Sequence, residues 1–152
     1  MSDVENDTGP QGPGQALPPL SHFHHVGLTV RDIERSEAWY RDVLGFQRAF
    51  VEPHHGGTGH TVVMIRPGTT LDIGLDHHDD KDGAVFDERR TGLDHVSMAV
   101  DRREDLDRWA QHFDRLGVAR GDVTDGKIGP VTFATLSFRD PDNIQLELIW
   151  QP

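Results

Sequence analysis

The chain has 152 residues, a length typical of one domain with a substantial hydrophobic core. Its 26 acidic and 15 basic residues give a net charge of −11, which argues against nucleic acid and anionic membranes as partners. There are no cysteines, so disulfides, thiolate nucleophiles and cysteine-based zinc sites are excluded.

The N-terminal region predicts neither a membrane anchor nor a folded element. No apolar run is long enough to span a bilayer, and the basic start and apolar stretch of a secretory signal are missing. We therefore expect a cytoplasmic protein. Residues 1–21 are rich in Gly, Pro and acidic residues, which predicts a disordered tail.

Module one is expected to cover about residues 22–76. Residues 23–30 alternate between apolar and polar side chains, as in a half-buried strand. Asp32 is the expected N-cap of a helix that runs to Leu44, and Gly45 is its expected C-terminal stop. Three strands are predicted to follow, at residues 46–52, 60–66 and 69–76.

The same order of elements is predicted a second time. Residues 77–92 are charged and contain glycine, which indicates a connection, and module two then covers about residues 93–152. A strand is expected at residues 93–100 and a helix from roughly residue 104 to residue 116, with Gly117 as its expected C-terminal stop. Three strands follow, at residues 118–123, 131–138 and 144–150.

The chain thus reads as an internal duplication. His25 and His95 hold matching places 70 residues apart, and Asp72 and Glu147 are matched at a spacing of 75 residues. The predicted fold class is α+β, with two βαβββ modules whose sheets form a cupped, mixed-sheet half-barrel.

Four strands each offer one histidine or carboxylate on the face that does not pack against a helix. Alternate side chains of a strand point to opposite faces, so the apolar residues of these strands cover the helices. The four residues left on the other face are His25, Asp72, His95 and Glu147. A single such residue is more often solvated than a ligand, but repetition in both halves strengthens the pattern. Two imidazoles with one or two carboxylates suit a divalent metal such as Zn, Fe, Mn, Ni or Co.

Three segments carry a family resemblance. HHVGLTVRDIERSEAWYRDVLGF (24–46), GLDHVSMAV (92–100) and FRDPDNIQLELIW (138–150) resemble the vicinal oxygen chelate superfamily, which includes glyoxalases, bleomycin resistance proteins and extradiol dioxygenases. The likeness covers about residues 22–151 and implies the cupped fold and a homodimer. It also implies that His25, His95 and Glu147 are metal ligands.

The resemblance leaves the fourth ligand open. Glyoxalase-like members commonly use a Glu in the fourth strand, whereas this chain has Asp72 there, one methylene shorter. Asp72 could lie outside the metal's direct ligands, and Asp76 or His78 could take its place. Without Asp72 the set becomes two histidines and one carboxylate, the pattern of mononuclear iron(II) oxygenases.

The function implied is metal-dependent chemistry on a small molecule with adjacent oxygens. A glyoxalase-like lyase or isomerase is favoured, with Glu147 binding the metal and moving a proton as the catalytic residue. The alternatives are an extradiol-type dioxygenase and a drug- or natural-product-binding protein that uses the same cavity. One of His54, His55 and His60 could contact the substrate. The sequence leaves open whether the site forms within one chain or across a dimer.

Overall fold

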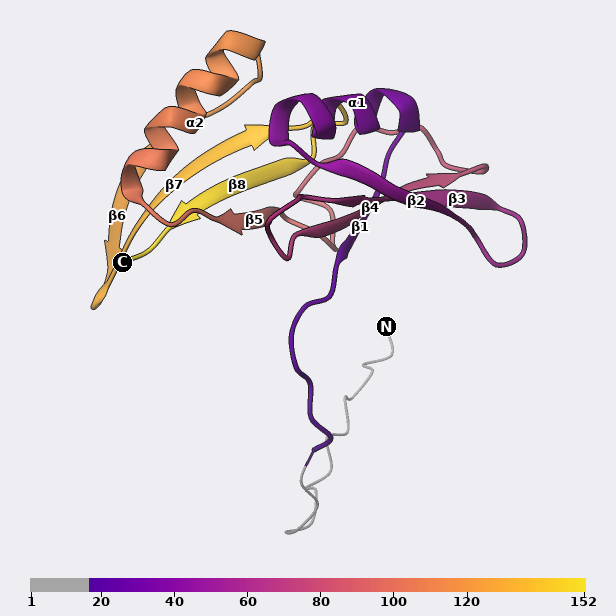
Figure 1. Cartoon of the computed structure of the whole chain (residues 1–152), viewed down its shortest axis with the longest axis horizontal. Helices are drawn as coiled ribbons and strands as arrows, with labels where there is room; N and C mark the ends of the chain where they lie inside the picture. Colours follow the sequence, from indigo (N-terminus) through magenta and orange to yellow (C-terminus); the bar gives the residue numbers. More distant parts are fainter. Residues whose placement is uncertain (1–16) are drawn as a thin grey trace, which may run out of the picture.

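The computed structural model describes residues 17–152, and most of the predicted tail lies outside the described residues. Residues 17–25 form neither helix nor strand. Beyond them the chain forms a strand, a helix and three strands, and then repeats this order (Figure 1).

The elements lie close to their predicted positions in both modules. Module one consists of β1 (Val26–Thr29), α1 (Ile33–Leu44), β2 (Gln47–Pro53), β3 (Gly59–Ile65) and β4 (Asp72–His78). Module two consists of β5 (Val96–Ala99), α2 (Arg103–Leu116), β6 (Thr124–Ile128), β7 (Val131–Arg139) and β8 (Gln145–Trp150).

One predicted strand is wrong. Residues 118–123 do not form a strand, and the sixth strand begins only at Thr124. The segment is tied to β7 by a single isolated bridge between Arg120 and Phe138, flanked by backbone hydrogen bonds from Gly121 and Arg139. Regular pairing with β7 starts further along the chain, where Thr124 lies opposite Thr135.

The predicted helix ends are confirmed. The Asp32 carboxylate accepts a hydrogen bond from the Arg35 backbone N–H at 3.0 Å, which satisfies one of the free donors of the first turn of α1. Gly45 and Gly117 close the two helices with φ of 76° and 67°, a left-handed conformation that a side chain disfavours. Each glycine turns the chain into the next part of its module.

Each module forms its own four-stranded sheet, in the orders β1-β4-β3-β2 and β5-β8-β7-β6. The first strand of each module pairs in parallel with the last, and the other pairs are antiparallel. Strands β1 and β5 therefore lie at sheet edges. In Figure 1 both helices lie on the same side of the two sheets, which leaves the opposite faces free of helices.

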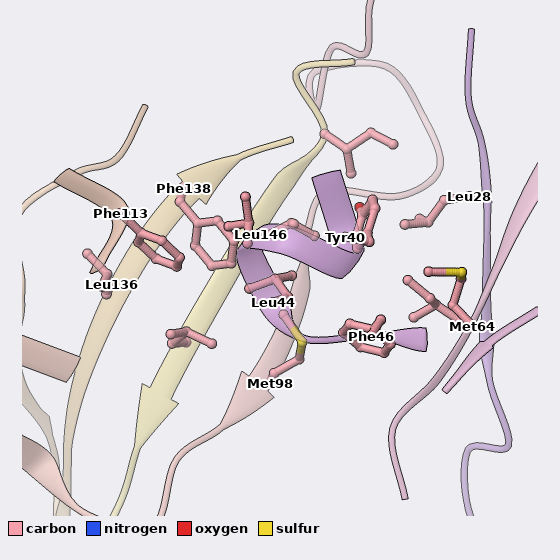
Figure 2. Close-up of a cluster of buried hydrophobic side chains, with 14 of the residues drawn as sticks. Leu28, Tyr40, Leu44, Phe46, Met64, Met98, Phe113, Leu136, Phe138 and Leu146 are labelled. Carbon is pink, nitrogen blue, oxygen red and sulfur yellow. The ribbon is translucent and has the colours of Figure 1, made fainter. Parts of the chain in front are cut away.

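The core continues from one module into the other. Figure 2 shows Leu28, Phe46 and Met64 on one side of α1 and aromatic side chains of module two on the other, with Leu44 and Met98 between them. All of these side chains are buried. The burial of apolar surface thus joins the two modules, and α1 serves both.

A buried polar contact also ties the modules together. The Tyr40 hydroxyl of α1 donates to the Asp140 carboxylate of the turn before β8 at 3.0 Å, and Trp39 stacks on Phe138 with ring centres 6.3 Å apart. Burial raises the pKa of Asp140 to about 6, and burial and the nearby Asp140 raise the pKa of Tyr40. The carboxylate also accepts the backbone N–H groups of Asp142 and Ile144, so it organises the turn as well.

Neither helix of the described part is long and apolar enough to cross a membrane.

Candidate metal centre

The first half of the predicted site lies on the helix-free face of the first sheet. His25 immediately precedes β1, and Asp72 is the first residue of β4. Pairing between these parallel strands begins at Val26 and Ile73, so His25 and Asp72, each one residue earlier, come next to each other. Both line a cavity of about 200 Å³ on this face. The structure thus brings these two predicted ligands together.

The cavity has a distinct chemical make-up. Its floor contains Gly27 and Gly74, which lie opposite each other in the register, and Phe50 and Val63 continue the same row across β2 and β3. The remaining lining residues are His24, His25, Glu52, Thr61, Asp72 and Asp76. None of the lining residues is Lys or Arg, so the cavity favours positive charge, whether a metal or a cationic group.

The second half of the predicted site lies on the corresponding face of the second sheet. His95 precedes β5 and is exposed, and Ser97 lies opposite Glu147 in the parallel pair of β5 and β8. The Ser97 hydroxyl donates to Glu147 Oε1 at 2.8 Å, and His95 Nδ1 lies 2.6 Å from the Asp94 carboxylate. Such partners fix the orientation of potential metal ligands.

The register corrects the sequence-based match between Asp72 and Glu147. Ser97, which pairs with Glu147, lies two residues after His95, just as Gly27 lies two residues after His25. Gly27 pairs with Gly74, so Gly74 holds the place of Glu147, and Asp72 lies two residues earlier. The match at a spacing of 75 residues was wrong because sequence spacing alone does not fix how two strands align.

The two halves remain separate within one chain. Over residues 17–152, no three histidine or acidic side chains gather in a way that could hold a metal ion. The donor types nevertheless suit one, since imidazole and carboxylate are good ligands for Zn, Fe, Mn, Ni or Co. Their chemistry therefore fits a metal, but within the described part of one chain they form two separate pairs.

The sequence named Asp76 and His54 separately, but it did not predict that they meet Thr61 in a hydrogen-bonded group at the other end of the first cavity. Asp76 Oδ1 accepts a hydrogen bond from the Thr61 hydroxyl and lies 3.1 Å from His54 Nε2. The His54 ring also lies beside the His78 ring, with ring centres 4.7 Å apart and planes tilted by 41°. The alternation of β4 placed Asp76 on this face, but only the register of β3 and β4 could place Thr61 beside it.

The fold and the two half-sites define a duplicated βαβββ protein with matched histidines at the start of each module. A family model described as the glyoxalase/bleomycin resistance protein/dioxygenase superfamily matches residues 22–148. The chain belongs to this superfamily, as the sequence resemblance predicted.

Solved structures agree with this assignment. A glyoxylase/bleomycin resistance protein/dioxygenase domain from Frankia sp. EAN1pec is 35% identical, with a TM-score of 0.77, over 88% of this chain and 100% of that one. A lactoylglutathione lyase from Agrobacterium tumefaciens is 20% identical, with a TM-score of 0.63, over 88% and 96% of the two chains.

A fosfomycin resistance protein from Listeria monocytogenes is 19% identical, with a TM-score of 0.62, over 87% of this chain and 94% of that one. At such identities the last two structures show a shared fold only. No curated protein sequence matches this chain.

Proposed function

We propose that this protein is a metal-dependent enzyme whose site is completed by two copies of the chain, and that it acts on a small molecule with adjacent oxygens. The observation that carries the proposal is the pair of half-sites. His25 and Asp72 lie on the helix-free face of the first sheet, and His95 and Glu147 on that of the second. Within the described part of one chain, no three possible metal ligands come together.

The sheet edges support completion by a second copy. Strands β1 and β5 carry the two histidines at their starts, and each is the edge strand of its own sheet. An edge strand presents unpaired backbone groups to another chain. Two copies related by a two-fold axis can place the first half of one chain against the second half of its partner, giving two equal sites.

The roles of the residues follow from their contacts. His25, His95 and Glu147 would hold the metal, with Asp72 beside His25 as the fourth ligand. The bound metal supplies Lewis acidity, which stabilises negative charge on the oxygens of the substrate. The Ser97 hydroxyl donates a hydrogen bond to Glu147 Oε1, and Oε2 has no hydrogen-bond partner among the described residues. Each carboxylate oxygen has two lone pairs, so Oε1 could bind the metal beside Ser97 while Oε2 takes a proton from carbon and returns it, as a glyoxalase-like lyase or isomerase requires.

The corrected register favours an extradiol-type dioxygenase as the second candidate. Gly74 stands at the place that Glu147 holds in the other module, and glycine has no side chain to bind a metal. The equivalent positions of the two modules therefore supply three ligands, His25, His95 and Glu147. Two histidines and one carboxylate suit iron(II) and oxygen chemistry. The position of Asp72 in the same cavity as His25 is what keeps the lyase or isomerase ahead.

Mixing two variants tests the proposal directly. His25→Ala and His95→Ala are each expected to bind no metal by elemental analysis. In a mixed dimer, one site carries both substitutions and the other carries neither, so one metal per dimer is expected. An absence of metal from the mixed dimer would contradict the shared site, and full metal content in either single variant would remove that histidine from it.

The reaction class is tested with the same preparations. Retention of metal in Asp72→Asn, together with oxygen uptake on addition of iron(II) and catechol, would support the dioxygenase. Weaker metal binding in Asp72→Asn, without oxygen uptake, supports the lyase or isomerase. Binding of a ligand that is unchanged by a chelator would support a binding protein instead.

A further inference from the structure

One cavity-lining group has no role in the proposed chemistry. Asp76 and Thr61 line the cavity beyond the glycine floor from His25 and Asp72, and His54, which is not part of the lining, lies beside Asp76. Asp76 is four residues after Asp72 on the same strand, a separation of about 13 Å at the rise of an extended chain. A metal–ligand bond is only about 2 Å long, so the two carboxylates cannot bind the same ion.

The contacts of Asp76 fix its carboxylate and leave one oxygen free. Thr61 and His54 both lie against Oδ1. Oδ2 has no hydrogen-bond partner within residues 17–152, and it is the atom that faces Gly27. The Asp76 side chain is 21% exposed, so this oxygen is partly shielded from water, which strengthens any interaction with an opposite charge.

The glycine floor keeps the space beside this oxygen open. A Cβ built on Gly27 would lie 2.9 Å from Asp76 Oδ2, and one on Gly74 would lie 3.0 Å from Thr61 Cγ2. Neither glycine has a positive φ, so the backbone itself does not demand glycine at these positions. The effect of glycine at these two positions is therefore to leave free volume above the floor of the cavity.

We propose that Asp76 is a specificity-determining residue, which binds a protonated amine of the substrate while the adjacent oxygens lie toward His25 and Asp72. The inference rests on the proposed function and names its substrate class: a small molecule with two neighbouring oxygens at one end and a cationic group at the other. Phe50 and Val63 provide apolar wall for the hydrocarbon part between them. Because no Lys or Arg lines the cavity, no basic side chain of the lining competes with the amine for the Asp76 carboxylate.

The test compares two catechols of similar shape. Dopamine carries a protonated amine on a two-carbon arm, and 4-ethylcatechol is its neutral counterpart. Calorimetric titration of the zinc-loaded protein is expected to show dopamine binding about tenfold more tightly, the effect of one charge-assisted hydrogen bond. A ratio near one for the wild type would overturn the proposal.

Three variants locate the effect. Asp76→Asn keeps the shape of the side chain and is expected to reduce the ratio to about one while leaving the metal content unchanged. Gly27→Ala keeps all charges and is expected to reduce the ratio by covering Oδ2. Asp79→Asn, a carboxylate outside the cavity that pairs with His77, is the matched control and should keep the wild-type ratio.

The outcomes separate this inference from the proposed function. An unchanged ratio in Asp76→Asn would overturn the role of Asp76 even if metal binding is as proposed. If elemental analysis finds no metal in the wild type, the proposed function fails. The role of Asp76 is then tested with 2-phenylethylamine against neutral 2-phenylethanol on the same protein, where a ratio near one would overturn it too.

Discussion

The two sheets share one topology but present different helix-free faces. In the first sheet, the paired positions after the histidine are Gly27 and Gly74, and a cavity lies over them. In the second sheet, the same positions hold Ser97 and Glu147, joined by a hydrogen bond. The duplicated framework thus supplies a shaped space on one side and an oriented carboxylate on the other.

One framework therefore carries two chemically different free faces. The buried faces remain equivalent, since Leu28 and Met98 both pack into the core at matched positions. The free faces differ, since the first carries Gly27 and Gly74 where the second carries Ser97 and Glu147. Four sets of substitutions test how the two modules differ and how they are joined.

The largest effect is expected from the histidine of the second sheet. His95→Ala removes a proposed direct ligand, so metal affinity should fall by more than the 10–100-fold typical of the loss of an outer partner. Elemental analysis after dialysis against graded chelator measures it. His112→Ala is the control, because His112 is a helix residue whose ring contacts the Val43 carbonyl. Equal losses in both variants would point to general destabilisation.

The next effect concerns the contact between the modules. Because burial raises the pKa of Asp140 to about 6, the folded protein holds this proton more tightly than the unfolded chain does. Its contribution to stability is therefore complete below about pH 4 and is lost as the pH rises through about 6, a loss of about 3 kcal/mol.

Urea unfolding at pH 4.5 and pH 7 measures this contribution. The Asp140→Asn variant, which cannot ionise, should lack it, so the difference in unfolding free energy between wild type and variant should change with pH in the stated direction. A difference that stays constant over this range would show that Asp140 does not titrate near pH 6.

A smaller effect is expected from the residue that orients Glu147. Ser97→Ala should weaken metal binding by 10–100-fold, because the carboxylate loses the hydrogen bond that holds Oε1. Ser137→Ala is a matched control, since Ser137 lies opposite Glu147 on the neighbouring strand without a hydrogen bond to its carboxylate. Competition with a chromogenic chelator compares the two, and similar affinities would remove Ser97 from the site.

The smallest effect on the free energy of unfolding is expected at the starts of the two helices. Asp32 caps α1 with its side chain, whereas Arg102 at the start of α2 makes no capping hydrogen bond. Asp32→Ala should therefore lower the free energy of unfolding by about 1 kcal/mol, and Arg102→Ser should leave it unchanged or raise it slightly. Thermal melts report both changes, and destabilisation by Arg102→Ser would contradict this comparison.

Much of the framework could be predicted from local pattern. Asp32, Gly45 and Gly117 marked helix ends, because capping depends on residues within one turn. Strand alternation assigned His25, His95 and Glu147 to the face away from the core. The sixth strand was misplaced because the segment around Arg120 pairs with β7 at only one bridge. Local propensity does not reveal how far two strands pair.

The duplication and the order of elements could be predicted from repeated local patterns of apolar and turn residues, and the superfamily from three segments that resemble it. Which residues face one another became known only from the three-dimensional fold. It placed Gly74 opposite Gly27, set Thr61 and His54 against Asp76, and kept the two half-sites apart within one chain. The physical reason is that strand register and module packing depend on contacts between residues far apart in the sequence, which local patterns leave undetermined.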